Sequence, residues 1–531
     1  MTRGKFYLTT AIDYPNSRPH IGTAFEKIGA DVQARYRRQQ GWDVFFLMGN
    51  DENTIKVVQR AGELGQDAKA YVDDMARQFR EVWAEIDISY DDFIQTSETR
   101  HRTGCQKFIQ RVYDAGDIYK KNYEALYCEG CEEFKTESQL TPEGRCPNHA
   151  NRDLKLVQEE NYFFRLSKYG EQLKTLYRER PDFVQPESRR NEILSLIESG
   201  LDDVSISRRD FTWGIDVPWD TEHKIYVWFD ALLNYITGVG YGTDEEKFRR
   251  WWPADLHFIG KDITRFHGAL WPAMLMSAGV EVPRRVFAHG FVYRKDEATG
   301  EVQKIAKSLG NVIEPMDIVR EFSSDAFRYY FMRECPFGGD GEFSFQRFAA
   351  SYNADLANNL GNLFSRTVSM VQRYFDGQLD GSRQMVADEV FSKLHLSDLV
   401  LRISEGIEAC RYNLSLETIW REVLDTGNRY IEEQRPWLLA NEKKPEYDRE
   451  ACRRVLVNLV EAVRVAAILV APFMPRAART IYDGFNFPVP FDEAGFDSVC
   501  RRPPLREDLH VTAALTNEGK VVPLFPKIAP K

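Results

Sequence analysis

A corner of proline, histidine and glycine opens the stretch 14-YPNSRPHIGTAFEKIGADVQ-33, between two segments that are typical of buried strands. Lys5 to Thr10 precedes it and Val44 to Met48 follows it, and both are short and apolar. Between them, one helical face carries Ile21, Phe25, Ile28 and Val32. The passage therefore predicts strand, turn, helix and strand. Such a parallel unit binds ligands outside the carboxyl ends of its strands, where the N–H groups of the helix also point, so the corner is a candidate nucleotide site.

The same sheet is expected to resume after a long interruption. Strand-like runs return at Lys224 to Phe229, His257 to Ile259 and Val286 to Ala288, with a helical stretch near Phe266 to Ala278. After Gly341 the chain is almost continuously helix-patterned. The pattern predicts an α/β protein with a Rossmann-like parallel sheet and an α-helical C-terminal domain. The expected boundaries are 1–117 and 224–350 for the two halves of the sheet domain, 118–223 for an insertion, and 351–531 for the helical domain.

Composition restricts the class of protein. With 531 residues, of which 43% are hydrophobic and 28% charged, the chain can bury several cores. The best membrane candidate, Val455 to Pro472, is interrupted by Glu461 and Arg464, so we expect a soluble, cytoplasmic protein. A net charge of −11 argues against a general polyanion binder, although a local basic groove can still serve one folded RNA.

Three of the eight cysteines crowd into one short segment. Cys128-x-x-Cys131 and Cys146-x-x-His149 form two pairs with the spacing that closes a tetrahedral Cys3His zinc shell. The alternative is a set of buried thiols with an unrelated surface histidine, but packing does not require paired spacing. Because protein ligands fill all four positions, we predict one structural Zn²⁺ in the insertion.

The stretch 303-QKIAKSLGNVIEP-315 carries a second chemical pattern. Lys304 and Lys307 are three residues apart and Ser308 and Gly310 follow, as expected of a loop that closes over phosphates. Taken alone, surface lysines are usually solvated charge. His20 has a similar ordinary interpretation, a local hydrogen bond at a helix start.

Together these motifs resemble the class I aminoacyl-tRNA synthetases, with "HIGT" in place of the usual HIGH and "KIAKS" in place of KMSKS. The resemblance narrows to the methionyl-tRNA synthetases over nearly the full chain. It rests on 10-TAIDYPNSRPHIG-22, 47-LMGNDEN-53, 226-YVWFDALLNY-235, 258-FIGKDITRFH-267 and the Cys3His insertion, and in the helical region on 362-NLFSR-366 and 435-RPW-437.

The resemblance implies a catalytic Rossmann-like domain with a zinc-binding insertion, followed by an α-helical anticodon-binding domain. It implies a methionine–tRNA ligase that uses ATP and Mg²⁺ to form methionyl adenylate and transfers the methionyl group to the 3′ end of initiator and elongator methionine tRNA. Because no appended C-terminal dimerisation domain is visible in the sequence, we expect a monomer.

The resemblance also implies roles for individual residues. The expected catalytic residues are His20, Lys304 and Lys307, and ATP would also contact Gly22, Thr23 and Ser308. Methionine would be bound by Ala11, Ile12, Tyr14, Asp51, Trp228, Ala231, Tyr235, Ile263 and His267, with Asp51 on the ammonium group, and the anticodon by Asn362, Arg366 and Trp437. Aromatic rings suit a thioether, although spacing alone favours ordinary core packing for Trp228 and Tyr235.

Four positions depart from the family pattern. Thr23 replaces the second histidine of the nucleotide motif, Ile305-Ala306 replaces Met-Ser in the lysine loop, Asn53 stands where histidine is common, and Leu232 replaces a frequent proline. Thr23 keeps a hydroxyl that can donate a hydrogen bond, so we expect ATP binding to survive.

Two other classes of function remain open at this point. A smaller nucleotidyltransferase could use the same sheet and histidine corner, but it would have little need for the zinc insertion or the helical domain. A nonenzymatic tRNA-binding paralogue would be expected to lose His20 or the lysines, which are present. Other class I synthetases, those for leucine, isoleucine and valine, carry a much larger editing insertion.

Overall fold

The computed structural model describes residues 3–128, 133–135, 140–147, 153–209, 211–297, 299–305, 312–380, 395–501, 505–517 and 519–528. Its centre is a six-stranded sheet with the strand order β3-β2-β1-β12-β13-β7, and all neighbouring strands are parallel. The strands are β1 (Lys5–Thr10), β2 (Asp43–Asn50), β3 (Asp92–Gln95), β7 (Val184–Gln185), β12 (Leu256–Gly260) and β13 (Val286–His289).

The first strand, helix and strand form as the sequence predicts. β1 pairs with β2 in parallel, with Phe6 opposite Val44. Helix α1 (Ile21–Gln39) joins them. The predicted apolar face of α1 is fully buried, because it packs between the sheet and the helical domain: Ile21, Phe25, Ile28 and Val32 are each 0% exposed.

The expectation of a sheet strand over Lys224 to Phe229 is wrong. Strand β11 (Asp220–Ile225) ends within this run and belongs to a separate antiparallel sheet with β9 (Ser207–Arg208) and β10 (Asp216–Val217). The rest of the run begins helix α7 (Val227–Leu232). A short, continuous apolar run has no period that separates strand from helix, and this caused the error.

The segment predicted as an insertion builds most of its own structure. A four-stranded sheet has the order β5-β4-β6-β8. However, β7 lies within the predicted insertion and adds an edge strand to the central sheet, where Val184 pairs with Val286. The elements here are β4 (Ile118–Cys128), β5 (Glu133–Lys135), β6 (Lys155–Phe164), β8 (Val204–Ser205), α5 (Gly170–Glu179) and α6 (Glu187–Glu198).

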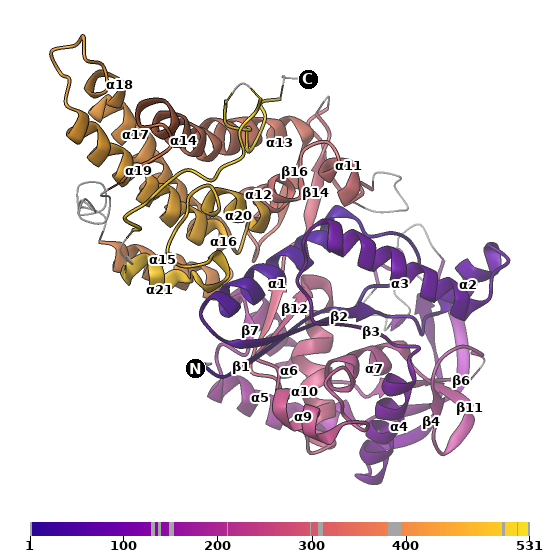
Figure 1. The fold of residues 1–531 in the computed structure, drawn as a ribbon. Helices are drawn as coiled ribbons and strands as arrows, with labels where there is room; N and C mark the ends of the chain where they lie inside the picture. The colour runs from indigo at the N-terminus through magenta and orange to yellow at the C-terminus, as the bar shows by residue number, and fades with distance from the viewer. Residues whose placement is uncertain are drawn as a thin grey trace.

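Helices cover both faces of the central sheet (Figure 1). The helix predicted near Phe266 to Ala278 is confirmed, because a π-helical turn, Phe266–Leu270, continues into α10 (Trp271–Ser277). A small sheet of β14 (Val292–Lys295), β15 (Val302–Lys304) and β16 (Gly341–Phe343) follows β13. The other helices of this part are α2 (Ile55–Glu63), α3 (Ala68–Glu85), α4 (Thr99–Asp114), α8 (Asn234–Thr237), α9 (Glu245–Trp251), α11 (Pro315–Val319) and α12 (Ser324–Glu334).

The C-terminal part is helical, as predicted, and lies beside α1 and α12 in Figure 1. Its long helix α19 is almost entirely buried and forms the centre of this domain. The helices are α13 (Phe345–Ser351), a π-helical segment Tyr352–Leu360, α14 (Gly361–Phe375), α15 (Leu396–Glu408), α16 (Tyr412–Ile419), α17 (Asp425–Gln434), α18 (Pro436–Leu439), α19 (Arg449–Val470), α20 (Pro475–Tyr482) and α21 (Phe496–Arg501).

Arg328 of α12 connects the two parts of the protein. Its fully buried guanidinium forms an ion pair with Asp31 of α1 at 2.6 Å. It also donates to the carbonyl oxygens of Pro472 at 3.0 Å and Phe473 at 2.8 Å, between α19 and α20. A buried charge is tolerated only when it is paired and hydrogen-bonded, so this cation requires both parts to be in place.

Among the residues that the structure describes, none of the helices is both long and apolar enough to cross a membrane.

Candidate active site

A cavity with a volume of about 370 Å³ opens at the carboxyl ends of four central strands, β1, β2, β12 and β13. Parallel strands bring the residues that follow them to one edge of the sheet, which is where α/β proteins bind their ligands. The lining residues are Ala11, Ile12, Asp13, Tyr14, His20, Gly22, Thr23, Glu26, Asp51, Trp228, Ala231, Leu232, Tyr235, Gly260, Asp262, Ile263, His267, His289, Gly290, Phe291, Val292 and Ile305.

The cavity brings together two groups of residues that the sequence analysis selected. Nine of them were expected to bind methionine: Ala11, Ile12, Tyr14, Asp51, Trp228, Ala231, Tyr235, Ile263 and His267. His20, Gly22 and Thr23 were expected to bind ATP, and they line the same cavity. The structure gives these residues a common location, and their individual roles remain predictions.

His20 is the N-cap of α1, and its ring is held by the helix it starts. Its Nδ1 accepts hydrogen bonds from the backbone N–H groups of Gly22 at 3.1 Å and Thr23 at 3.2 Å. Since Nδ1 is an acceptor, the proton of the neutral ring lies on Nε2, which can then donate to an anion. The start of α1 also carries the positive end of the helix dipole, so this end of the cavity suits phosphate.

Two glycines at the cavity permit close approaches that a side chain would prevent. A Cβ atom on Gly22 would lie 3.0 Å from Cε1 of His20, so the ring would have to move. A Cβ atom on Gly290 would lie 1.9 Å from the carbonyl oxygen of Gly339. The sequence analysis identified Gly22 but missed Gly290, whose constraint comes from a distant segment.

At the other end, the cavity wall is aromatic. Trp228 stacks on Phe266, with ring centroids 4.0 Å apart. His267 contacts the Tyr235 hydroxyl at 2.7 Å through Nε2 and the Ile263 carbonyl oxygen at 3.1 Å through Nδ1. Burial lowers the pKa of His267 to about 4, so the ring is neutral at pH 7. Its Nδ1–H therefore donates to Ile263, and Nε2 accepts from Tyr235.

A buried ionic network, which the sequence analysis missed, supports the middle of the cavity. Lys27 contacts Glu26 at 2.6 Å and Asp13 at 3.1 Å, and His289 contacts Glu26 at 3.0 Å. Burial acts to raise the pKa of Glu26, but Lys27 and His289 hold it below its ordinary value. Burial acts to lower the pKa of Lys27, but Asp13 and Glu26 hold it above its ordinary value. The signal was available, since two adjacent charged residues stand between Phe25 and Ile28 of the apolar face of α1.

Comparisons with known proteins identify the family. The family model described as tRNA synthetases class I (M) matches residues 6–155 and 150–368. The model for the anticodon binding domain of methionyl tRNA ligase matches residues 382–493. The chain belongs to the methionyl-tRNA synthetases.

Individual relatives support this assignment. The chain is 44% identical to the methionine–tRNA ligase of Caldanaerobacter subterraneus, over 90% of this chain and 73% of the relative. It is 43% identical to that of Thermotoga maritima, over 91% of this chain and 75% of the relative. The structure of Mycobacterium tuberculosis methionyl-tRNA synthetase in complex with methionyl-adenylate superposes with a TM-score of 0.89 at 39% identity and covers 98% of this chain and 100% of that one.

The lysine loop starts at the cavity. Lys304 ends β15, where it pairs with Tyr293 of β14. The next residue, Ile305, is 7% exposed and lines the cavity. Lys307 and Ser308 lie outside the described residues, so their predicted contacts with ATP rest on the sequence.

Half of the predicted zinc shell lies within the described residues. Cys128 and Cys146 are 1% and 0% exposed, whereas Cys131 and His149 lie outside the described part of the chain. From Thr141 to Pro147 only Cys146 is buried. A single thiol buried in a polar turn fits chelation better than core packing, so the two described cysteines fit a zinc site.

The predicted anticodon residues occupy one side of the helical domain. Asn362 and Arg366 lie on one face of α14 and contact α17, where Asn362 donates to Asn428 at 3.2 Å and Arg366 pairs with Glu432 at 2.6 Å. Trp437, in α18, is half-buried beside Arg366. The three predicted residues therefore lie on neighbouring helices.

Proposed function

We propose that this chain activates methionine with ATP and transfers the methionyl group to the 3′ end of methionine tRNA, with both steps in the cavity described above. The observation that carries the proposal is that one cavity gathers the residues expected for methionine and those expected for ATP. When two reactants are bound in one site, their binding has already removed most of the entropy that would otherwise be lost in the reaction step, so the activation barrier is lower.

Methionine occupies the aromatic end of the cavity. Asp51, which is 3% exposed, pairs with the ammonium group. The thioether lies against Trp228 and Tyr235, because aromatic rings make favourable contacts with a polarizable sulfur. A neutral His267 adds no charge, which suits an uncharged side chain better than an imidazolium would.

In the first step, a carboxylate oxygen of methionine attacks the α-phosphorus of ATP and the bond to the β-phosphate oxygen breaks. The carboxylate is already ionised at neutral pH, so no general base is needed. The start of α1 and Nε2–H of His20 hold phosphate oxygens, while Lys304 and Lys307 stabilise the departing pyrophosphate. Mg²⁺ bound to ATP would neutralise further phosphate charge, and carboxylates such as Asp262 line the cavity to hold it.

In the second step, a ribose hydroxyl at the 3′ end of the tRNA attacks the carbonyl carbon of methionyl adenylate, and AMP leaves. The helical domain at 351–531 selects the tRNA through Asn362, Arg366 and Trp437. One structural zinc holds the insertion at 118–223. We further infer that the enzyme works as a monomer, in the cytoplasm, on initiator and elongator methionine tRNA.

ATP–pyrophosphate exchange measured with each of the twenty amino acids tests the proposal. Methionine should support exchange, and the others should not at comparable concentration. Exchange without any amino acid would point to a nucleotidyltransferase, and tRNA binding without exchange would point to a nonenzymatic paralogue. Either result would overturn the proposed activity.

A further inference from the structure

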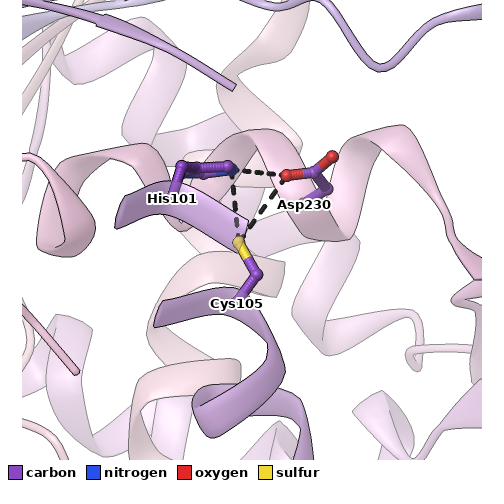
Figure 2. Close-up of side chains that lie close together, drawn as sticks. All are labelled: His101, Cys105 and Asp230. Carbon is purple, nitrogen blue, oxygen red and sulfur yellow. Dashed lines mark hydrogen bonds and ion pairs between the residues drawn. The ribbon is translucent and has the colours of Figure 1, made fainter. Parts of the chain in front are cut away.

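A buried polar cluster lies directly behind the methionine end of the cavity. His101 and Cys105 are one turn apart on α4, and Asp230 comes from α7 (Figure 2). His101 Nε2 lies 2.5 Å from Asp230 Oδ1, and Cys105 Sγ lies 3.2 Å from His101 Nε2 and 3.7 Å from Asp230 Oδ1. All three side chains are fully buried.

These three residue types can ligate a metal, but the spacing favours a hydrogen-bonded cluster. Two ligand atoms at about 2.0 Å from a tetrahedral zinc are separated by roughly 3.3 Å, whereas the nitrogen and oxygen here are 2.5 Å apart. At that separation the His101 nitrogen carries a proton that it donates to the carboxylate. Burial also raises the pKa of the Cys105 thiol well above its ordinary value, so the sulfur is protonated.

The second oxygen of Asp230 extends the cluster to another part of the chain. Asn53 donates through Nδ2 to Asp230 Oδ2 at 2.7 Å and to the carbonyl oxygen of Thr96 at 3.1 Å. Asp230 thus bridges α4 and the segment that follows β2. On the far side of the imidazole, His101 Nδ1 contacts the Thr237 hydroxyl at 2.7 Å.

Asp230 and Asn53 each lie on the side of their segment that faces away from the methionine pocket. On α7, Trp228 and Ala231 line the cavity and Asp230 does not, because residues two apart on a helix point to different faces. After β2, Asp51 lines the cavity and Asn53 does not. The pair formed by Asn53 and Asp230 therefore joins, from behind, the segment that carries the proposed ammonium contact and the helix that carries the aromatic wall.

We propose that Asp230 is a positioning residue for methionine, which fixes Asp51 relative to Trp228 and Ala231 through its hydrogen bond with Asn53. The inference rests on the proposed function. It also gives a structural role to Asn53, one of the positions that departs from the family pattern. The ATP end of the cavity is formed by the start of α1, which this bridge does not touch, so the effect should be specific to methionine.

Kinetics of pyrophosphate exchange test this role. Asn53→Ala and Asp230→Ala should each raise KM for methionine roughly 10-fold or more, since small misplacements in an active site have large effects, and leave KM for ATP within about twofold. Asp230→Asn should keep KM for methionine near the wild-type value. Its oxygen can accept from Asn53, and His101 can change tautomer to accept from the new amide.

Asn458→Ala is the matched control, because Asn458 is a buried asparagine of the helical domain that donates to Tyr430 at 3.2 Å. It should lower the melting temperature without changing KM for methionine. If Asn53→Ala gives no soluble protein, Asn53→Ser replaces it, since a serine hydroxyl can still donate to a nearby carbonyl but is too short to reach Asp230.

Several results would overturn the positioning role. One is a KM for methionine that stays at the wild-type value in Asn53→Ala or Asn53→Ser, and another is a KM for methionine that rises together with KM for ATP. Equal defects in Asp230→Asn and Asp230→Ala would mean that the negative charge acts, rather than the hydrogen bonds. A second stoichiometric metal that is lost in Cys105→Ala would mean that the cluster is a metal site. Wild-type protein without methionine-dependent exchange would instead reject the proposed function itself.

Discussion

The guanidinium carbon of Arg366 lies 5.8 Å from the centroid of the Trp437 ring. Arg366 belongs to α14 and Trp437 to α18, and the ion pair between Arg366 and Glu432 of α17 fixes the cation in place. A cation over a tryptophan face is a favourable contact. A half-buried ring that is held in this way has little freedom to lose when a nucleotide base stacks on it.

We therefore predict that Trp437→Ala weakens charging of methionine tRNA by about 1–3 kcal/mol, the usual contribution of one stacked base. Adenylation without tRNA should not change, because the ring lies outside the cavity. Charging assays with methionine tRNA and with the same tRNA carrying an altered anticodon measure the effect. Tyr447→Ala, at an aromatic residue of the same domain that is 40% exposed, serves as the control. If Trp437→Ala slows both tRNAs equally, or slows adenylation, the residue is structural.

The lysine loop should govern activation rather than methionine binding. Lys307→Ala is expected to lower the adenylation rate by roughly 10²–10³, because its charge acts on the pyrophosphate that develops in the transition state. Methionine affinity should stay nearly unchanged. Burst kinetics measure the step, with Lys174→Ala as the control at a partly exposed lysine of α5. An unaltered adenylation rate would remove Lys307 from the mechanism.

Metal analysis should find one zinc per chain. Cys128→Ala should lose that zinc, whereas Cys500→Ala, at an exposed cysteine, should retain it. Removing the metal should loosen the insertion before it affects adenylation, since the shell has no position open to substrate. Stoichiometric zinc in Cys128→Ala would reject the proposed ligand set.

Stability should depend on pH through Asp325, at the start of α12. Burial raises the pKa of Asp325 to about 6, from an ordinary value of 3.8. The folded protein therefore binds this proton more tightly than the unfolded chain does. The resulting stabilisation is complete below pH 3.8 and is lost as the pH rises through 6, a total of about 3 kcal/mol.

Asp325→Asn should remove this dependence, since its amide oxygen can still accept the hydrogen bond that Ala477 N–H donates to Asp325 at 2.5 Å. Melting temperatures of the wild type and the variant at pH 5 and pH 8 test the prediction. The variant should gain relative to the wild type at pH 8. A difference in melting temperature that is the same at both pH values would contradict it.

Local sequence patterns predicted those parts of the sheet and of the site that depend on residues close together in the chain. The apolar face of α1, the strands on either side of it and the position of His20 depend on residues close in sequence, and the structure confirms them. The motif resemblance added distant residues such as His267, which lines the same cavity as Ile12.

Other features could not be predicted because they depend on contacts between remote segments. Asn53 and Asp230 are separated by 177 positions, and no spacing pattern in the sequence indicates that the two side chains form a hydrogen bond. The strand expected at Lys224 to Phe229 failed for a related reason: the apolar run from Ile225 to Phe229 has no period that separates strand from helix, and distant contacts decide between them. The two-residue strand β7 carries too little pattern to be recognised at all.

Helix α1 spans 19 residues, about 28 Å. His20 caps its first turn at the cavity, and the helical domain contacts the same helix further along. Tyr412 donates to the carbonyl oxygen of Gly29 at 2.7 Å, and a Cβ atom on Gly29 would lie 2.2 Å from Phe337. A fragment that ends at residue 350 would expose the part of α1 that Tyr412 contacts. It would also remove the carbonyl oxygens of Pro472 and Phe473 that Arg328 donates to, and leave those of Ile86 and Asp87. The nucleotide-binding half is thus unsuited to expression as a separate piece unless its new surface is redesigned with polar residues along α1.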